Sequence, residues 1–210
     1  MNEELINILK RVAQLFMKYG IKSVTMDDIS HELGISKKTL YNYVKDKNEL
    51  VSLIIDMEFE VRDKCFSLIN NTYKNAIDEL YQVHKIVKNI IKEHSPASVY
   101  DLKKYYPTEY QKMHTMRRQK LIEHHMMNLK RGKEEGLYRP EINEELITKL
   151  QVQRIENSFE NDFMTIEETV GPRVFLEFFE YHIRGIATPK GIEELERQLG
   201  IIKSEIKPEF

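Results

Sequence analysis

Apolar residues recur at helical spacing along most of the chain. The first run predicts a helix that ends at Gly20, and its apolar positions are Leu5, Ile8, Leu9, Val12, Ala13 and Phe16. A second long run follows Asp46, which is placed to cap a helix with Glu49 at the capping-box position. Alternation typical of strands, a repeat of about 30 residues and low-complexity tracts are all absent from the sequence. The pattern therefore predicts an all-α protein.

The remaining helical patterns form a larger C-terminal body. They cover residues 75–94, a short segment from Ser95-Pro96 to Pro107, residues 108–135, residues 146–159 and a run after Gly171-Pro172. Pro189-Gly191 separates a charged tail helix. We expect two domains, a small one over residues 1–47 and a larger one over residues 48–210.

The stretch from Thr25 to Lys47 contains two short helical patterns separated by Gly34-Ile35-Ser36. Thr25 is placed to cap the first, with Asp28 three residues later, and Gly34 is placed to end it. Ser36 is placed to cap the second helix, in which Leu40 and Val44 share an inward face. This arrangement predicts a helix-turn-helix.

The outward face of the second pattern carries polar groups suited to DNA. It consists of Lys38, Tyr41, Asn42 and Lys45, which are spaced i, i+3, i+4, i+7. Lysine reaches phosphates or guanine edges, asparagine pairs with adenine, and tyrosine donates to phosphate or packs on a thymine methyl group. Four lysines lie between Gly34 and Asn48 against Asp46 alone, so base is concentrated here although the net charge is −2 and the pI about 6.4.

The run from Ile8 to Leu50 resembles the N-terminal domain of the TetR family of bacterial transcription regulators. The resemblance rests on the helix end from Phe16 to Gly20, and on Thr25, Ile29-Ser30, Gly34-Ile35-Ser36, Thr39-Leu40-Tyr41, Lys47 and Glu49-Leu50. Val44 stands where the family usually has Phe, and Ser30 where it usually has Ala. Both positions are on the packing side, so these departures concern the fit of the core more than contact with DNA.

The resemblance implies a homodimer that binds a palindromic double-stranded DNA operator and responds to a small-molecule effector. It implies that Lys47 and Thr25 contact phosphates. It also implies that the helix starting at Lys47 joins the two domains, and that a change in the tilt of this helix transmits a ligand signal. Together with the polar face, it predicts these DNA-contacting residues: Thr25, Ser36, Lys37, Lys38, Thr39, Tyr41, Asn42, Tyr43 and Lys47.

Two further sets of residues follow from the larger domain. The dimer interface is expected at the two penultimate helices, with Ile155, Phe175, Phe178, Phe179, His182 and Ile186, although these side chains could instead fill the core of one chain. The effector pocket is expected among Tyr81, His84, Tyr105, Tyr106, Met113, Met116, Phe159 and Phe163. Aromatic residues and methionines at helical spacing are more often plain core.

Other chemistry finds little support in the sequence. There is no Gly-rich phosphate loop, no GxSxG and no HExxH, and the adjacent His124 and His125 point different ways on a helix. The single cysteine, Cys65, excludes an internal disulfide and favours a buried thiol over a redox sensor. We therefore expect no enzyme activity, no metal and no cofactor. No apolar run is long enough to span a membrane, so we expect no membrane association and a cytoplasmic location.

The sequence is best interpreted as a repressor that leaves its operator when a ligand occupies the larger domain. A transcriptional activator of the same fold is an alternative that the sequence does not separate from it. A helical protein-interaction scaffold and a helical enzyme with a DNA-binding-like N-terminus are the rivals from other classes.

Overall fold

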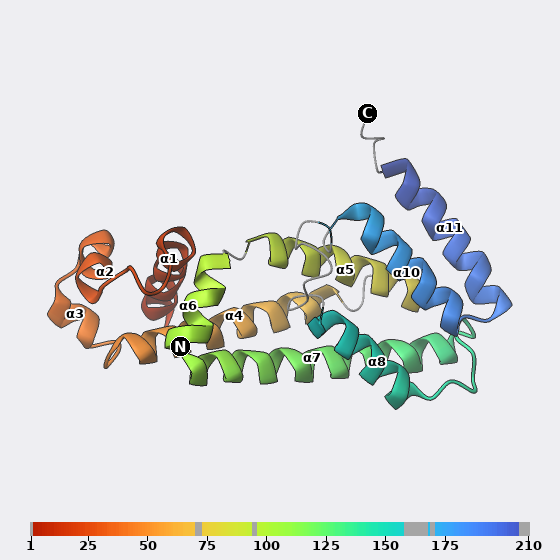
Figure 1. Cartoon of the computed structure of the whole chain (residues 1–210), viewed down its shortest axis with the longest axis horizontal. Helices are drawn as coiled ribbons and strands as arrows, with labels where there is room; N and C mark the ends of the chain where they lie inside the picture. Colours follow the sequence, from red (N-terminus) through yellow and green to blue (C-terminus); the bar gives the residue numbers. More distant parts are fainter. Residues whose placement is uncertain (1, 70–72, 94–95, 158–167, 169–170, 206–210) are drawn as a thin grey trace. The chain divides into compact units, whose positions relative to one another are not determined.

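The structure, a computed structural model, describes residues 2–69, 73–93, 96–157, 168 and 171–205. The chain divides into two compact units, Met1–Ile69 with Glu93–Arg117, and Asn70–Lys92 with Arg118–Phe210. The regular elements of the described part are helices, and a single isolated bridge joins Tyr138 to Ala187 there. The all-α prediction is confirmed (Figure 1).

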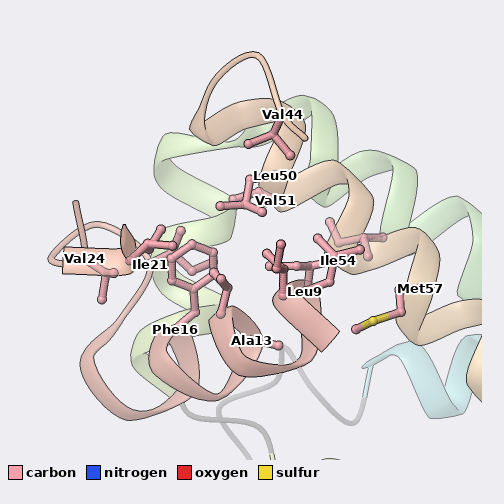
Figure 2. Packing of buried hydrophobic residues seen from close by; sticks show 14 of the residues in the cluster. Leu9, Ala13, Phe16, Ile21, Val24, Val44, Leu50, Val51, Ile54 and Met57 are labelled. Atoms are coloured by element: carbon pink, nitrogen blue, oxygen red, sulfur yellow. The ribbon is translucent and has the colours of Figure 1, made fainter. Parts of the chain in front are cut away.

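The first unit contains α1 (Glu3–Tyr19), α2 (Met26–Leu33), α3 (Lys37–Tyr41), α4 (Lys47–Ile69), α6 (Pro96–Tyr105) and the first part of α7 (Pro107–Glu134). The inner face of α1 packs on α4 in the core of this unit. Figure 2 shows Leu9, Ala13 and Phe16 of α1 turned toward Leu50 and Ile54 of α4. Leu9 and Leu50 have no exposed surface. The short helices α2 and α3 pack into the same buried cluster as this face of α1.

Both short helices begin at the caps that the sequence predicts, and α2 also ends at the predicted glycine. The Asp28 N–H donates to the Thr25 hydroxyl over 3.2 Å, and the Thr25 N–H donates to the Asp28 carboxylate over 2.8 Å, which completes a capping box. Gly34 ends α2 with a φ of 71°, a left-handed conformation that favours glycine. The Ser36 hydroxyl then accepts the Thr39 N–H over 3.0 Å and caps α3.

Arg11 of α1 fixes the far end of α2. Its guanidinium donates to the carbonyl oxygens of Glu32 over 2.5 Å and of Leu33 over 3.4 Å. The last carbonyls of a helix have no partner within the helix and carry partial negative charge, so a cation there both donates hydrogen bonds and complements the dipole. α2 is thus capped by a side chain at each end.

α6 holds the connection between α1 and α2. The Ser98 hydroxyl donates to the Phe16 carbonyl over 2.7 Å, and the Asp101 carboxylate accepts the Lys22 N–H over 2.7 Å. Leu102 and Tyr106 enter the same buried cluster as Phe16. α6 therefore belongs to the packed unit that carries the helix-turn-helix, although it lies about 80 positions later in the sequence.

The second unit contains α5 (Ala76–Glu93, as far as Lys92), the rest of α7, α8 (Glu144–Asn157), α10 (Pro172–Ile186) and α11 (Pro189–Glu205). Its apolar core includes Ile77, Leu80, Ile183, Leu195 and Ile202. Glu79 is buried, and Arg131 compensates its charge with a hydrogen bond of 2.9 Å.

One sequence-based expectation differs from the observed helices. α3 ends at Tyr41 and Asn42 forms its C-cap, so Lys45 is not on the helix that carries Lys38 and Tyr41. The chain leaves helical geometry because the Lys45 N–H donates to Glu49 and the Glu49 N–H donates to Asp46, which starts α4 instead. The domain boundary at residue 47 remains a prediction for the DNA-binding segment, since the compact unit around that segment also includes later residues. None of the described helices combines the length and apolarity that crossing a membrane requires.

We expect Arg11→Met to lower the free energy of unfolding of the first unit by about 1–2 kcal/mol, because two α2 carbonyls lose a charged donor. Urea unfolding followed by circular dichroism measures this loss. Lys10→Met, at an exposed neighbouring position of α1, is the matched control and should leave stability within about 0.5 kcal/mol of the wild type. Equal midpoints for the two variants would contradict the role assigned to Arg11.

Hydrogen bonds from the Thr25 hydroxyl and N–H hold the pKa of the Asp28 carboxyl below its usual range. A lowered pKa in the folded state stabilises the fold above the unfolded pKa of about 3.9, and this contribution is lost as the pH falls through the folded pKa. The stability gap between wild type and Asp28→Asn should therefore be widest above about pH 5 and narrow below about pH 4. Thermal unfolding at a series of pH values measures it, with Glu32→Gln as a control on the same helix. A gap that does not change with pH would refute the assignment.

Candidate DNA-binding surface

The outward side chains of α3 form the core of the candidate surface. Leu40 and Val44 are buried beneath it, as predicted, with 0% and 2% of their surface exposed. Lys38, Tyr41 and Asn42 face solvent, and their side chains make no hydrogen bond or ion pair with any described residue. Tyr41 keeps 49% of its surface exposed, which is unusual for a large aromatic side chain without a partner.

The other predicted contacts on α3 also have structural roles. The Ser36 hydroxyl and the Thr39 hydroxyl are 2.8 Å apart and share a hydrogen bond at the start of the helix. Lys37 forms an exposed ion pair with Asp27 of α2. Because exposed pairs of this kind contribute little stability, the Lys37 ammonium can exchange Asp27 for a phosphate at small cost.

Tyr43 is turned away from this surface. It packs against the buried cluster of the first unit, and a hydrogen bond with Glu4 of α1 raises the pKa of its phenol. It also lines, with Thr39 and Arg11, a cavity of about 140 Å³ between α1 and the helix-turn-helix. That volume is below the range of sites for drug-sized ligands. The geometry therefore favours Tyr43 as a residue that positions α3.

Lys47 lies at the start of α4, and its ammonium points to backbone. The Nζ atom donates to the Ile21 carbonyl over 2.5 Å and lies 5.8 Å from the centre of the Phe16 ring. Burial lowers the pKa of this lysine, and the nearby positive charge of Lys22 acts in the same direction. Lys47 therefore joins α4 to the α1–α2 connection in addition to any contact with phosphate.

The side chain of Thr25 is likewise already hydrogen-bonded within the protein. Its hydroxyl donates to Asp28 over 2.7 Å and accepts the Asp28 N–H, so its only proton is already used. The backbone N–H groups of Met26 and Asp27, in the first turn of α2, have no partner within the helix. The geometry favours these amides over the Thr25 hydroxyl as donors to a phosphate.

The two packing-side departures from the family pattern fit the core. Ser30 is buried, and its hydroxyl donates to the Met26 carbonyl over 2.9 Å, so the extra polar group relative to alanine is satisfied within α2. Val44 is buried next to Leu50 (Figure 2). Neither residue reaches the outward face.

The predicted pocket residues do not come together as one described cluster. Tyr105, Tyr106, Met113 and Met116 belong to the first unit, where Tyr106 is buried and Tyr105 is exposed. Tyr81 is in the core of the second unit, with its ring 5.8 Å from that of Phe179. The side chain of His84 and all of Phe159 and Phe163 lie outside the described residues, as does the side chain of Cys65.

The predicted dimer residues divide between the core and the surface of the second unit. Phe179 and Ile186 each have 2% of their surface exposed and pack in the core of the second unit, which is the alternative that the sequence left open for these side chains. Phe175 packs against the same cluster, and Ile155 is half-buried. His182 bonds to Gln151 of α8. Phe178 is the one of the six that remains exposed.

Three large apolar side chains outside the sequence-based set are also exposed on α8 and α10, and together with Phe178 we call them the apolar stripe. Leu146 and Leu150 of α8 are 55% and 54% exposed, and Tyr181 of α10 is 81% exposed. α8 and α10 are in contact, since the Arg154 guanidinium lies 4.8 Å from the centre of the Phe178 ring. Leu146 and Leu150 have the i, i+4 spacing of one helical face, whereas Thr148 and Val152 lie on the buried side of α8.

Comparison with known proteins agrees with these observations. The family model described as "Bacterial regulatory proteins, tetR family" matches residues 8–54. An HTH-type transcriptional regulator of Staphylococcus aureus strain USA300 is 33% identical over 60 residues, which cover 29% of this chain and 32% of that protein. The match thus spans about a third of the relative's length.

Solved structures extend the likeness to most of the chain. A transcriptional regulator from Cytophaga hutchinsonii is 20% identical with a TM-score of 0.75, and the match covers 89% of this chain and 100% of that one. A TetR-family regulator from Agrobacterium tumefaciens is 13% identical with a TM-score of 0.64, over 89% of this chain and 99% of that one. At such identities the likeness concerns the fold. Residues 8–54 are thus similar to the DNA-binding segment of the TetR family of bacterial regulatory proteins, and the fold of most of the chain is similar to that of solved transcriptional regulators.

Proposed function

We propose that the protein is a homodimeric transcription regulator, a repressor, that binds a palindromic operator and leaves it when a small molecule binds the second unit. One observation carries the proposal: Lys38 and Tyr41 of α3 and its C-cap Asn42 face solvent and bond to no described side chain, on a helix that is capped and packed from behind. The TetR family is a family of regulators and not of enzymes. Because operator DNA lies in the bacterial cytoplasm, we expect the protein to act there.

The groups on this surface divide into those that can contact base edges and those that can contact the phosphate backbone of DNA. Asn42 can pair with an adenine edge, and Lys38 with guanine or phosphate oxygens. Tyr41 can donate to phosphate or pack on a thymine methyl group. Lys37, the first amides of α2 and the ammonium of Lys47 are donors suited to the phosphate backbone. A short palindrome read by two such surfaces requires half-sites about one turn apart, roughly 34–36 Å.

The stripe of Leu146, Leu150, Phe178 and Tyr181 supports the homodimer. Four large apolar side chains exposed together on two adjacent helices are costly in water and typical of an interface. A twofold dimer places the same stripe of each chain on that of the other, which is what a palindromic operator needs. We therefore replace most of the sequence-based interface with this stripe and retain Phe178.

Release by an effector requires that ligand binding change the placement of α2 and α3. α4 begins at Lys47, which bonds to the α1–α2 connection, and α6 holds the same connection through Ser98 and Asp101. A displacement of either helix would therefore move the start of α2. An effector achieves this only if it binds the released state more tightly than the DNA-bound state.

The first test is fluorescence anisotropy of the purified protein on labelled duplex from upstream of its own gene, with a scrambled duplex of the same composition, at two salt concentrations. We expect tighter binding to the native duplex, weakened by salt and saturating at two chains per site. If the upstream duplex fails, duplexes selected from a random pool replace it. Failure to enrich any sequence from that pool would refute the proposal.

On the duplex so identified, we expect Lys38→Ala and Tyr41→Ala each to weaken binding by about 1–3 kcal/mol, because each removes a contact that α3 alone supplies. Lys130→Ala, at an exposed position of α7, is the control and should bind as the wild type does. The circular dichroism spectrum and the oligomeric state in solution should be those of the wild type in all three variants. Unchanged affinity in both α3 variants would contradict the assignment of this face.

We expect Leu150→Glu to weaken self-association at least tenfold, because it places a charge at the centre of the apolar stripe. Sedimentation equilibrium measures the dissociation constant directly. Met127→Glu introduces the same charge at a 60% exposed apolar position of α7 and should leave the dimer intact. Equal association of the two variants would place the interface elsewhere.

A further inference from the structure

Three lysines of the first unit lie over tyrosine rings at the end of α1 and on α6. We call this group the lysine–tyrosine surface, and it consists of Lys18, Tyr19, Lys22, Tyr100, Lys104 and Tyr105. The Lys22 and Lys104 Nζ atoms lie 4.6 Å and 5.3 Å from the centre of the Tyr105 ring. Lys18 lies 4.8 Å from the Tyr19 ring, and Lys104 also donates to the Tyr100 hydroxyl over 2.9 Å. All three rings are exposed.

The ammonium groups of this surface contact rings and not carboxylates in the described part of the chain. Some other lysines do pair with acids, as Lys112 does with Asp56 at 2.7 Å and Lys133 with Glu144 at 3.1 Å. Within the described part of the chain, Lys18, Lys22 and Lys104 form no ion pair, and their neighbours are phenol rings. The one carboxylate of α6, Asp101, accepts the backbone N–H of Lys22.

The arrangement keeps these ammonium groups charged and available. The hydrogen bond with the Tyr100 hydroxyl raises the pKa of Lys104. A ring face attracts a cation without removing its charge, so the ammonium can still donate to an anion. In a chain whose net charge is −2, such a local excess of base indicates an anionic partner.

The surface is continuous with the residues proposed to hold operator phosphates. Lys22 is three residues before Thr25, and the Lys47 Nζ atom donates to the Ile21 carbonyl directly beside it. Lys22 and Lys47 are close enough that the charge of Lys22 contributes to lowering the pKa of Lys47. A strand of phosphates that reaches Lys47 therefore approaches Lys22 next.

We propose that the lysine–tyrosine surface is a second phosphate-binding area, which holds the DNA backbone next to the phosphates contacted from the starts of α2 and α4. This inference rests on the proposed DNA-binding function and extends it to α6. Lysine ammonium groups and tyrosine hydroxyls are donors to phosphate and carry no sequence information. The surface contributes affinity and salt dependence, whereas α3 contributes sequence preference.

The test is the salt dependence of binding by Lys22→Gln/Lys104→Gln, with the full-length protein on the selected duplex and on a scrambled one. Each lost phosphate contact reduces the slope of log affinity against log salt by about 0.9, so the slope should become shallower by about 1.8 for each bound chain. Affinity should fall by the same factor on both duplexes. Lys22→Arg/Lys104→Arg keeps the charges and should restore the slope. Lys120→Gln/Lys130→Gln on α7 removes two exposed lysines of the second unit and should leave the slope unchanged.

The outcomes separate this inference from the proposed function. A wild-type slope in the Gln double variant, with specific binding by the wild type, would overturn the inference and leave the function standing. A shallower slope that the Arg double variant does not restore would also overturn it, because a structural effect would then explain the loss. If the wild type shows no specific, salt-dependent binding, the proposed function itself fails.

Discussion

The burial of one face of α1 is the constraint on which the DNA-facing surface depends. α2 has eight residues and α3 has five, and isolated helices below about 12–15 residues are marginal in water. Their stability comes from Ile29, Leu33 and Leu40, which pack in the same cluster as Leu9 and Phe16. Because the inward side chains of α3 are apolar and pack in the same cluster as α1, its outward side chains are not needed to pack the core.

That division separates two kinds of DNA-facing residue. The side chains of Lys38, Tyr41 and Asn42 bond to none of the described residues, so contact with a matching base edge breaks no described bond in the protein. Lys37 and Lys47 already bond to Asp27 and to a backbone carbonyl, and a phosphate must replace or share those partners. In the proposed function, the first group therefore distinguishes one DNA sequence from another, while the second group responds to the position of the DNA backbone. The second group also links DNA contact to the packing of α4 and the α1–α2 connection.

Local signals account for most of what the sequence predicted correctly. Thr25, Ser36 and Gly34 act within four residues of themselves, and the apolar spacing of α1 reflects a single face. The premature end of α3 was missed because Leu40 and Val44 keep helical spacing although the Lys45 N–H has already turned to Glu49. α6 was missed as part of the first unit because the bond from Ser98 to Phe16 joins residues 82 positions apart. The apolar stripe of α8 was missed because that helix is apolar on two sides, and one chain alone does not show which side faces its own core.

The bonds from α6 to the α1–α2 connection have a consequence for protein engineering. Chimeric regulators are built by joining the DNA-binding segment of one family member to the effector-binding segment of another, and a junction near residue 47 appears natural from the sequence. In this protein such a junction would pair Phe16 and Lys22 with a foreign α6 that lacks Ser98 and Asp101. The Phe16 carbonyl would keep only the Gly20 N–H, and the Lys22 N–H would lose the Asp101 carboxylate. The recipient would then acquire a helix-turn-helix in which α6 no longer bonds to the α1–α2 connection. A transplant that carries both Met1–Ile69 and Glu93–Arg117 keeps these bonds, so the transferable module is discontinuous in sequence.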